Sequence, residues 1–245
     1  MTITSLRTLS ALLLLVVAGC DQASTAKPTP VAVKTAAPAG ATNWLAVTTA
    51  TPEGGFRIGN PNAKVKLLEF ASLTCPHCKD FHAEAMATIR NKYVASGNVS
   101  YEYRNFVLNG PDYAASMLAR CQGPQPFFGL LNAFYTDQAS WTAPFGKLTD
   151  ADSKRLAALP QEKQIAALAE VGKLDAYVRT RGMTRAKFDM CLADKTQLDK
   201  LAALRTQAVD TYKLTGTPGF IINGVTQTEV YGWAALEPKL QAALQ

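Results

Sequence analysis

Two cysteines separated by two residues are the side chains most able to do chemistry, in the segment Cys75-Pro76-His77-Cys78. Two thiols at this spacing can close a small disulfide ring and exchange it with thiols of other proteins. Pro76 suits the first turn of a helix, because the N–H that it lacks would have no partner there. Thiol–disulfide exchange is therefore the first chemistry that these residues indicate.

Cys75 is expected at the N-terminus of the helix that Pro76 begins. Unpaired N–H groups and the positive end of the helix dipole favour an anion there, so this thiol should ionise more easily than a free one. His77 can add a hydrogen bond or a positive charge to the same thiolate. Because a stable thiolate stabilises the reduced pair, the disulfide would be a strong oxidant.

The pair has two other interpretations, a structural disulfide and half of a zinc site. A zinc site needs more ligands at suitable spacing, and the only histidine besides His77 is His82. The position of Cys75 and Cys78 between a predicted strand and a predicted helix favours the redox interpretation.

The elements around the pair follow from hydrophobic periodicity. Residues 65–71 form an apolar run typical of a buried strand, and residues 76–94 carry apolar side chains at four-residue spacing, which predicts a helix. After a turn at Gly97-Asn98, the alternating segment 99–107 completes a strand–helix–strand unit, expected to be right-handed.

The segment from about residue 111 to 214 shows no convincing strand. Amphipathic runs in it predict helices at 113–121, 127–135, 162–171 and 185–212. This block has the size of a compact helical unit.

Strand-like runs return after this block, at 219–222 and 225–230, on either side of the hairpin turn Asn223-Gly224. A closing helix is predicted at 233–244. The chain is therefore predicted to be an α/β domain, residues 53–245, interrupted by a helical insertion.

Residues 1–19 have the pattern of an export signal. The apolar stretch 9–17 is too short to span a bilayer as a stable helix. The small residues before Cys20 resemble a bacterial lipoprotein signal, in which Cys20 is lipidated and becomes the new N-terminus. A plain secretory signal with an incidental cysteine is the alternative. Asp21 resembles the inner-membrane retention pattern of enteric bacteria, and both signals lead to a compartment that permits disulfides.

Residues 20–52 are predicted to be a flexible tether. They are rich in Ala, Thr and Pro and have too few large apolar groups to offset chain entropy. Trp44, Leu45 and Val47 are exceptions that could dock on the domain. The tether would hold the domain near the membrane surface.

The charge pattern favours no nucleic-acid partner. The formal net charge of +6 is modest for 245 residues, and basic side chains alternate with acidic ones in the helical runs. No glycine-rich phosphate-binding loop is present, so neither a nucleotide nor a flavin is predicted, and no metal is called for.

Two segments, Glu69–Cys78 and Thr215–Gly224, resemble the DsbA family of periplasmic thiol oxidases when taken in this order with helices between them. The likeness spans about residues 55–245. It implies a thioredoxin fold with a helical insertion, and a redox-active disulfide in place of a bound cofactor.

The resemblance implies a role for each residue of the site. Cys75 would form the mixed disulfide, Cys78 would be the buried resolving sulfur, and His77 would tune the thiolate. Pro218 would be a cis-proline against the disulfide, and Thr217 would offer backbone groups to a client strand. From the residues alone, Thr217-Pro218 also fits an ordinary strand start.

Glu69 has two interpretations. A carboxylate in a buried strand is costly unless it has a function or a partner. The resemblance implies an acidic group near the buried cysteine that relays protons during exchange. Periodicity leaves open a glutamate at the strand end that faces solvent.

Cys121 and Cys191 both lie in the helical block. An oxidising compartment favours a second, structural disulfide, and closing a loop of about seventy residues could contribute up to ~4 kcal/mol. The alternative is two buried cysteines that never meet. Some DsbA relatives carry an additional cysteine pair, and we favour the disulfide, with a role in stability or tuning.

The function predicted from these features is that of a dithiol oxidase of the periplasm, anchored to the inner membrane through Cys20. Its substrates would be reduced secreted proteins, and a membrane reoxidase of the DsbB type would restore its disulfide. The alternatives are an isomerase or reductase on the same fold, a non-enzymatic copper or zinc carrier, and an assembly factor for one partner.

Overall fold

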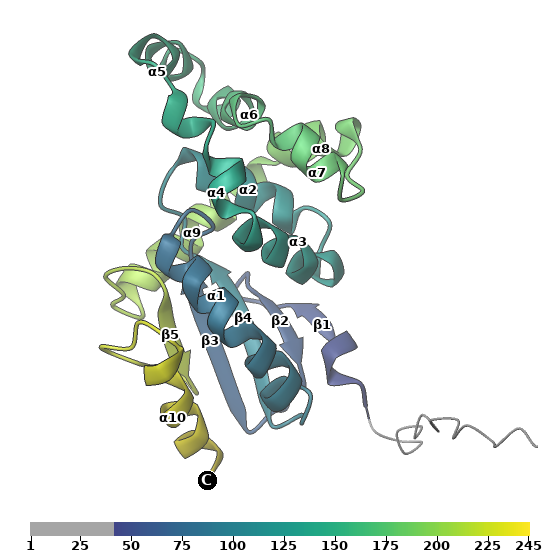
Figure 1. Ribbon diagram of the computed structural model, residues 1–245, viewed down its shortest axis with the longest axis vertical. Helices are drawn as coiled ribbons and strands as arrows, with labels where there is room; N and C mark the ends of the chain where they lie inside the picture. Colours follow the sequence, from purple (N-terminus) through teal and green to yellow (C-terminus); the bar gives the residue numbers. More distant parts are fainter. Residues whose placement is uncertain (1–41) are drawn as a thin grey trace, which may run out of the picture. The chain divides into compact units, whose positions relative to one another are not determined.

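The strand that leads into the cysteine pair lies inside a mixed sheet. The computed structural model describes residues 42–245, and its sheet has six strands in the order β1-β2-β4-β3-β5-β6 (Figure 1). In sequence order the strands are β1 (Thr48–Ala50), β2 (Phe56–Gly59), β3 (Val65–Ala71), β4 (Val99–Asn105), β5 (Gly219–Ile222) and β6 (Val225–Thr226). β3 pairs in parallel with β4 and antiparallel with β5.

Two helices pack on one face of the sheet. α1 (Pro76–Thr88) continues into a π-helical segment, η2 (Ile89–Val94), and α10 (Trp233–Leu244) closes the chain. Figure 1 shows α1 in front of the strands and α10 at the lower left, and α10 contacts both β3 and α1. The Phe81 ring of α1 lies 4.6 Å from the Phe220 ring of β5, so α1 and β5 belong to the same hydrophobic core.

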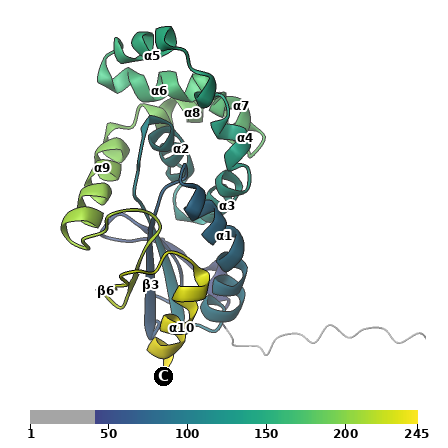
Figure 2. The same cartoon turned by 60° about the vertical axis from the view of Figure 1, so that its left-hand side comes forward.

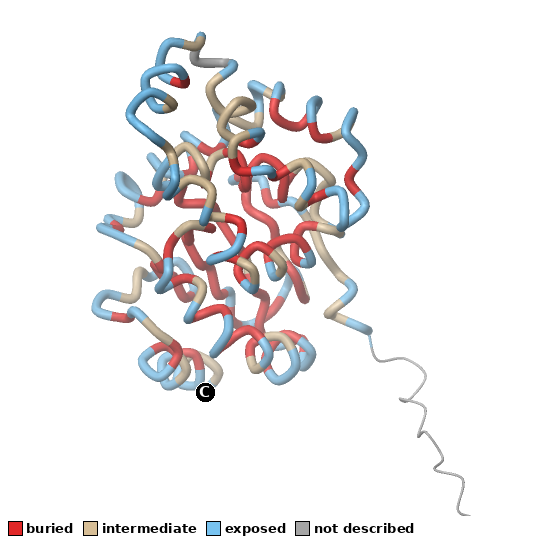
Figure 3. Tube along the Cα trace, turned by 45° about the horizontal axis from the view of Figure 1, so that its top comes forward, coloured by how far each residue is buried: buried red, intermediate tan, exposed pale blue. Residues whose placement is uncertain are grey.

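The other face of the sheet is covered by the end of α9 (Lys195–Asp210), as Figure 2 shows with α9 and α1 on opposite sides of the strands. Ala208 of α9 packs there with Leu68, Phe70 and Ile221. Because both faces are covered, β4 is buried along nearly its whole length, whereas a strand with one exposed face would alternate. Figure 3 shows the buried residues gathered in the middle of the fold.

The helical insertion contains more and shorter helices than periodicity predicts. Besides α9 they are α2 (Gly110–Arg120), α3 (Pro124–Thr136), α4 (Gln138–Thr142), α5 (Asp150–Ala157), α6 (Gln161–Val171), α7 (Leu174–Arg179) and α8 (Arg185–Leu192), with a 3₁₀ turn, η3 (Phe145–Lys147), after α4. The predicted run 185–212 is wrong in its continuity. The Asp194 side chain accepts a 3.0 Å hydrogen bond from the Gln197 N–H, which starts α9 afresh.

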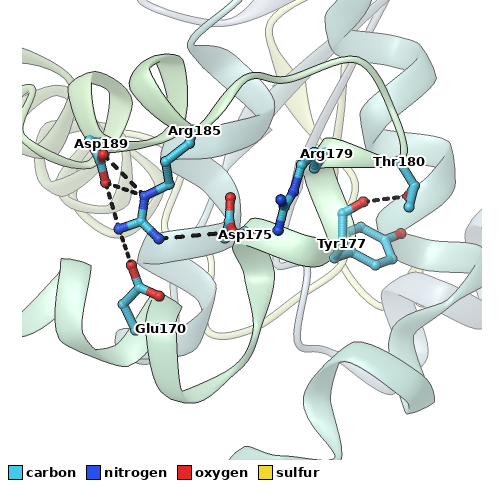
Figure 4. Close-up of polar contacts among 7 residues, drawn as sticks. All are labelled: Glu170, Asp175, Tyr177, Arg179, Thr180, Arg185 and Asp189. Carbon is cyan, nitrogen blue, oxygen red and sulfur yellow. Dashed lines mark hydrogen bonds and ion pairs between the residues drawn. The ribbon is translucent and has the colours of Figure 1, made fainter.

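Ion pairs connect α6, α7 and α8 (Figure 4). Arg185 pairs with Glu170 of α6 and with Asp189 one turn further along α8, and it lies 3.9 Å from Asp175 of α7. Asp175 also pairs with Arg179 at 2.9 Å. Exposed ion pairs of this kind contribute little individually to the stability of a protein.

The predicted tether is wrong at its C-terminal end. Residues 44–46 form a 3₁₀ turn, η1 (Trp44–Ala46), and β1 pairs with β2. The Trp44 ring lies against Gly97, whose φ of 77° favours glycine. The docking expected of Trp44, Leu45 and Val47 is observed, since Leu45 packs against the core and the Val47 oxygen accepts a bond from the Gly59 N–H. Composition alone misses strand β1, because its backbone hydrogen bonds go to β2. The signal, Cys20 and residues 20–41 lie outside the described residues.

The other predicted elements agree with the structure to differing degrees. The strands 65–71 and 219–222 and the helix 233–244 have the predicted bounds, while 99–107 ends at Asn105. The predicted strand 225–230 is wrong beyond Thr226. Within residues 42–245, no helix is long and apolar enough to cross a membrane.

Candidate active site

The cysteine pair lies where β3 ends and α1 begins. Cys75 is the N-cap residue of α1, with extended backbone, and Pro76 is the first helical residue. Cys75 and Cys78 are both free thiols and both buried, whereas Pro76 and His77 are exposed. The helix N-terminus thus presents Cys75 at the edge of a core that encloses Cys78.

The loop before β5 reaches the same point from far along the chain. β5 is antiparallel to β3, with Gly219 opposite Phe70, so the start of β5 lies beside the end of β3. The Thr217–Pro218 peptide bond is cis. The backbone oxygen of Thr217 lies 3.4 Å from the Sγ of Cys75 and accepts a hydrogen bond from the thiol.

The surroundings of Cys75 favour its thiolate. A hydrogen bond from the Cys78 thiol, with others from the Thr217 side chain and the backbone N–H groups of Cys78 and His77, lowers the pKa of Cys75 to about 5. Partial burial acts in the opposite direction but is outweighed. Cys75 is therefore ionised at neutral pH when the pair is reduced.

The surroundings of Cys78 favour its thiol. Burial raises the pKa of Cys78 well above its ordinary value. The hydrogen bond between its thiol and Cys75, and the charge of Glu69, raise this pKa further. The two sulfurs thus differ in protonation state. Such a difference between neighbouring groups separates the roles of attacking and resolving sulfur.

Glu69 is buried, with 1% of its surface exposed, which excludes the solvent-facing interpretation. Burial raises the pKa of Glu69 to about 8, although the Tyr101 hydroxyl donates a 2.5 Å hydrogen bond to its carboxylate. Glu69 is therefore mostly protonated at neutral pH. It is an acid close enough for its charge to affect Cys78.

Several side chains around the pair were not predicted from the sequence. Asp112 and Gln138 contact the turn between β3 and Cys75, and the Tyr135 hydroxyl donates a 3.2 Å bond to the Ser72 oxygen. All three come from the helical insertion. Asp112 has the pattern of an ordinary first-turn acidic residue, so no local signal indicates its position.

Cys121 and Cys191 form a disulfide, with their Cα atoms 5.5 Å apart. The bond joins the end of α2 to α8, both within the insertion. It is separate from the Cys75–Cys78 pair in sequence and in the elements that carry it.

His82 is a core histidine. It is buried on α1, packs 4.7 Å from the Tyr135 ring and lies 3.3 Å from the Asn132 oxygen. Burial lowers the pKa of His82 to about 4, so it is neutral. Among the described side chains, those of residues 42–160 and 163–245, no three of His, Cys, Asp or Glu gather so that they could hold a metal ion.

A cavity of about 300 Å³ adjoins the cis-proline loop. Its walls come from residues 213–219 and 226–231, among them Thr217 and the exposed ring of Tyr231. Main-chain groups and an aromatic side chain therefore line a hollow next to the loop whose Thr217 oxygen contacts Cys75.

Comparison with known proteins agrees with this architecture. The thioredoxin family model matches residues 51–242. The crystal structure of a protein-disulfide isomerase from Novosphingobium aromaticivorans is 34% identical, with a TM-score of 0.74, over 77% of this chain and 96% of that one. Wolbachia pipientis alpha-DsbA1, 23% identical, shares the fold with a TM-score of 0.64, over 80% of this chain and 93% of that one.

A curated relative from Rickettsia bellii, assigned as a protein-disulfide oxidoreductase, is 28% identical over 200 residues, which is 81% of this chain and 68% of the relative. A second one, from Rickettsia typhi, is 28% identical over 77% of this chain and 61% of its own length. The chain thus spans roughly two thirds of the length of these relatives.

The chain belongs to the thioredoxin family. The helices inserted between β4 and β5, together with the cysteine pair at the start of α1, place it more narrowly among the DsbA-like protein-disulfide oxidoreductases. The predicted fold, a thioredoxin fold interrupted by a helical insertion, is confirmed.

Proposed function

We propose that the protein is an exported dithiol oxidase, which introduces disulfides into secreted proteins through Cys75 and Cys78. The observation that carries the proposal is the position of the pair: Cys75 lies at the N-terminus of α1 beside the cis Thr217–Pro218 bond, with Cys78 buried behind it. The hydrogen-bond donors at this position lower the pKa of Cys75 to about 5. A stabilised Cys75 thiolate stabilises the reduced protein, and the Cys75–Cys78 disulfide then tends to accept electrons.

The reaction begins with attack of a client thiolate on Sγ of Cys75. A client–Cys75 bond forms, the Cys75–Cys78 bond breaks, and its electron pair stays on Cys78. Because Cys78 has a raised pKa, it takes up a proton, and Glu69 is a buried acid near it that can supply one.

A second client thiol, as its thiolate, then attacks the client sulfur of the mixed disulfide. The client leaves with a new disulfide, and Cys75 leaves as a thiolate, which its low pKa favours. Two electrons now reside on Cys75 and Cys78, and a membrane reoxidase of the DsbB type would remove them.

The cis-proline loop is the proposed docking edge for the client. An extended client segment would bond to the backbone at Thr217 by strand addition, with its side chains towards the cavity beside Tyr231. This places a client cysteine next to Cys75.

Attachment and location are part of the same proposal. Lipidation of Cys20 would anchor the protein to the inner membrane on the periplasmic side. A tether to the membrane raises the effective concentration of a membrane-bound reoxidase.

The test is the reduction potential of the Cys75–Cys78 pair in the purified protein, equilibrated in glutathione buffers and read by alkylation and mass. A value near roughly −120 mV, in the range of strong dithiol oxidants, supports the oxidase. A value near roughly −270 mV, typical of thioredoxin, means a reductase and contradicts the proposed direction.

An isomerase is the second candidate, supported by the name of the similar protein from Novosphingobium aromaticivorans. Refolding of scrambled ribonuclease separates the two. An isomerase restores activity with its pair reduced, whereas an oxidase acts on the reduced substrate with its pair oxidised. Stoichiometric copper or zinc binding that is lost in Cys75→Ser would instead support the metal carrier.

A further inference from the structure

The turn Ser72–Thr74 connects β3 to Cys75, and the helical insertion holds this turn through a buried carboxylate. Asp112, in the first turn of α2, has no exposed surface. Its Oδ1 accepts a 3.1 Å bond from the Leu73 N–H, and its Oδ2 accepts a 2.6 Å bond from the Ser72 hydroxyl. These residues are about forty positions apart in the chain, so the contact is wholly tertiary.

A second insertion helix holds the same turn from its carbonyl side. Gln138, the first residue of α4, is buried. Its Nε2 donates bonds of 2.8 Å to the Leu73 oxygen and 3.0 Å to the Cys75 oxygen. The N–H and the carbonyl oxygen of Leu73 are therefore both bonded to side chains of the insertion. The N–H bonds to the Asp112 carboxylate and the oxygen to the Gln138 amide.

Asp112 also fixes the neighbouring loop. Its Oδ2 accepts a 3.0 Å bond from the Leu108 N–H, and Oδ1 accepts a 3.2 Å bond from the Ser116 hydroxyl. Burial raises the pKa of Asp112 to about 6 against the effect of these donors, so the carboxylate is ionised at neutral pH. A buried charge costs stability unless its partners compensate, and four donors do so here.

We propose that Asp112 and Gln138 form a clamp through which the helical insertion positions Cys75 at the N-terminus of α1. Both are positioning residues, since they contact the turn and the Cys75 backbone and not the sulfur. The inference rests on the proposed redox function of the Cys75–Cys78 pair.

The clamp affects the Cys75 thiolate by holding it next to the N–H groups that donate hydrogen bonds to it. The N–H groups of His77 and Cys78 stabilise the Cys75 thiolate only while the residue stays in its N-cap position. The Ser72 backbone in turn bonds to Cys78. A looser turn lets Cys75 move from its donors, and the pKa of Cys75 then rises.

Positioning and plain electrostatics predict opposite shifts for Asp112→Asn. This variant keeps the side-chain shape but removes the charge, and its amide group faces one of the buried N–H donors of Leu73 or Leu108. If Asp112 acted only through its charge, neutralising it would lower the pKa of Cys75. A positioning role predicts a rise of about one unit, the equivalent of one lost hydrogen bond.

Gln138→Leu is the companion variant, because it keeps the size and removes both donated bonds. We expect the same direction of shift. Ser116→Ala is the matched control: it removes a donor to the same carboxylate, but one that lies on α2 and does not touch the turn. It should leave the pKa of Cys75 unchanged while lowering thermal stability.

The measurement is the ultraviolet thiolate absorbance of the reduced full-length protein as a function of pH, with each variant checked by circular dichroism. A raised pKa of Cys75 in Asp112→Asn and Gln138→Leu, but not in Ser116→Ala, supports the clamp. A lowered or unchanged pKa in the folded variants overturns it.

If the Asp112→Asn variant does not fold, the same thiolate titration of Gln138→Leu and Ser72→Ala tests the clamp. The thiolate titration needs no client. Failure of the proposed oxidase function would instead show as a wild-type protein that titrates normally but does not oxidise reduced ribonuclease.

Discussion

The Sγ of Cys75 lies 3.4 Å from the backbone oxygen of Thr217, a residue 142 positions further along the chain. The antiparallel pairing of β5 with β3 produces this contact. It places the backbone of the loop before β5 beside the reactive sulfur, so one loop can both tune the thiol and present hydrogen-bonding groups to a client.

Thr217→Val should raise the pKa of Cys75, because the Thr217 side chain is one of the groups that lower it. Valine keeps the volume but cannot donate a hydrogen bond. A rise of about half a unit to one unit is expected, as for the loss of one modest hydrogen bond. Thiolate absorbance against pH measures it. Thr215→Val, on the same loop, is the control, and an equal shift there would contradict a specific role of Thr217.

Cys75→Ser should abolish dithiol oxidation, since Cys78 then has no thiol at the N-terminus of α1 with which to form the disulfide. Cys78→Ser should instead accumulate mixed disulfides with oxidised clients: the Cys75 thiolate attacks a client disulfide, one client sulfur leaves as a thiolate, and no Cys78 thiol is present to resolve the new bond. Oxidation of reduced ribonuclease and non-reducing electrophoresis show the two outcomes. Normal turnover in Cys75→Ser would disprove the assignment of the nucleophile.

His77→Pro should raise the pKa of Cys75 and lower the reduction potential of the pair. Proline removes the backbone N–H at this position, which is one of the donors to the thiolate. Its fixed φ is compatible with the first helical turn, so the fold should persist.

His77→Ala is the matched control for this experiment, because alanine keeps the backbone N–H and removes only the imidazole. Any shift that it shows measures the contribution of the ring. An unchanged potential in His77→Pro, measured in glutathione buffers, would refute the role of this N–H.

Glu69→Gln should stabilise the protein at neutral pH. Burial raises the folded-state pKa of Glu69 to about 8 from 4.5, so the folded state binds a proton that the unfolded state has released. Stability from this group is therefore present below pH 4.5 and is lost as the pH rises towards 8. At pH 7 the gain in the variant should reach up to about 3 kcal/mol.

Urea unfolding at several pH values measures this difference. The wild type should lose stability relative to Glu69→Gln across that window, and the two should converge at acidic pH. If the unfolding free energies of the wild type and Glu69→Gln changed in parallel with pH, a buried and protonated Glu69 carboxyl would be contradicted. The variant should also take part in exchange more slowly, since it cannot supply a proton to Cys78.

Replacing both Cys121 and Cys191 by serine should lower the free energy of unfolding by about 4 kcal/mol, the chain-entropy value for a loop of this length. The bond closes a separation of 70 residues between α2 and α8. Thermal unfolding with and without reductant measures the effect. Loss of the low pKa of Cys75 in this variant would contradict a purely structural role for the bond.

Local patterns were enough to determine the elements that carry the site. The apolar run before Cys75 predicts β3 with the bounds that it has, and Pro76 marks the first residue of α1. The Asn223-Gly224 turn marks the end of β5. These signals are encoded within a few residues, as helix starts, buried strands and hairpin turns are.

Short and edge elements were beyond such patterns. β1 and β2 have three and four residues, and α4 has five, too few to show a period. β1 exists because β2 supplies its hydrogen-bond partners, although the composition around it is that of a tether. The break between α8 and α9 depends on the cap by Asp194.

The sequence by itself determined the chemistry: two thiols at a helix start, with a proline-containing loop later in the chain. Only the tertiary structure decided how that chemistry is tuned. Glu69 is buried because α1 and α10 cover its face of the sheet, and Asp112 meets Leu73 because α2 folds back over the end of β3. Burial and hydrogen bonds between distant segments set pKa values, and neither leaves a local pattern in the sequence.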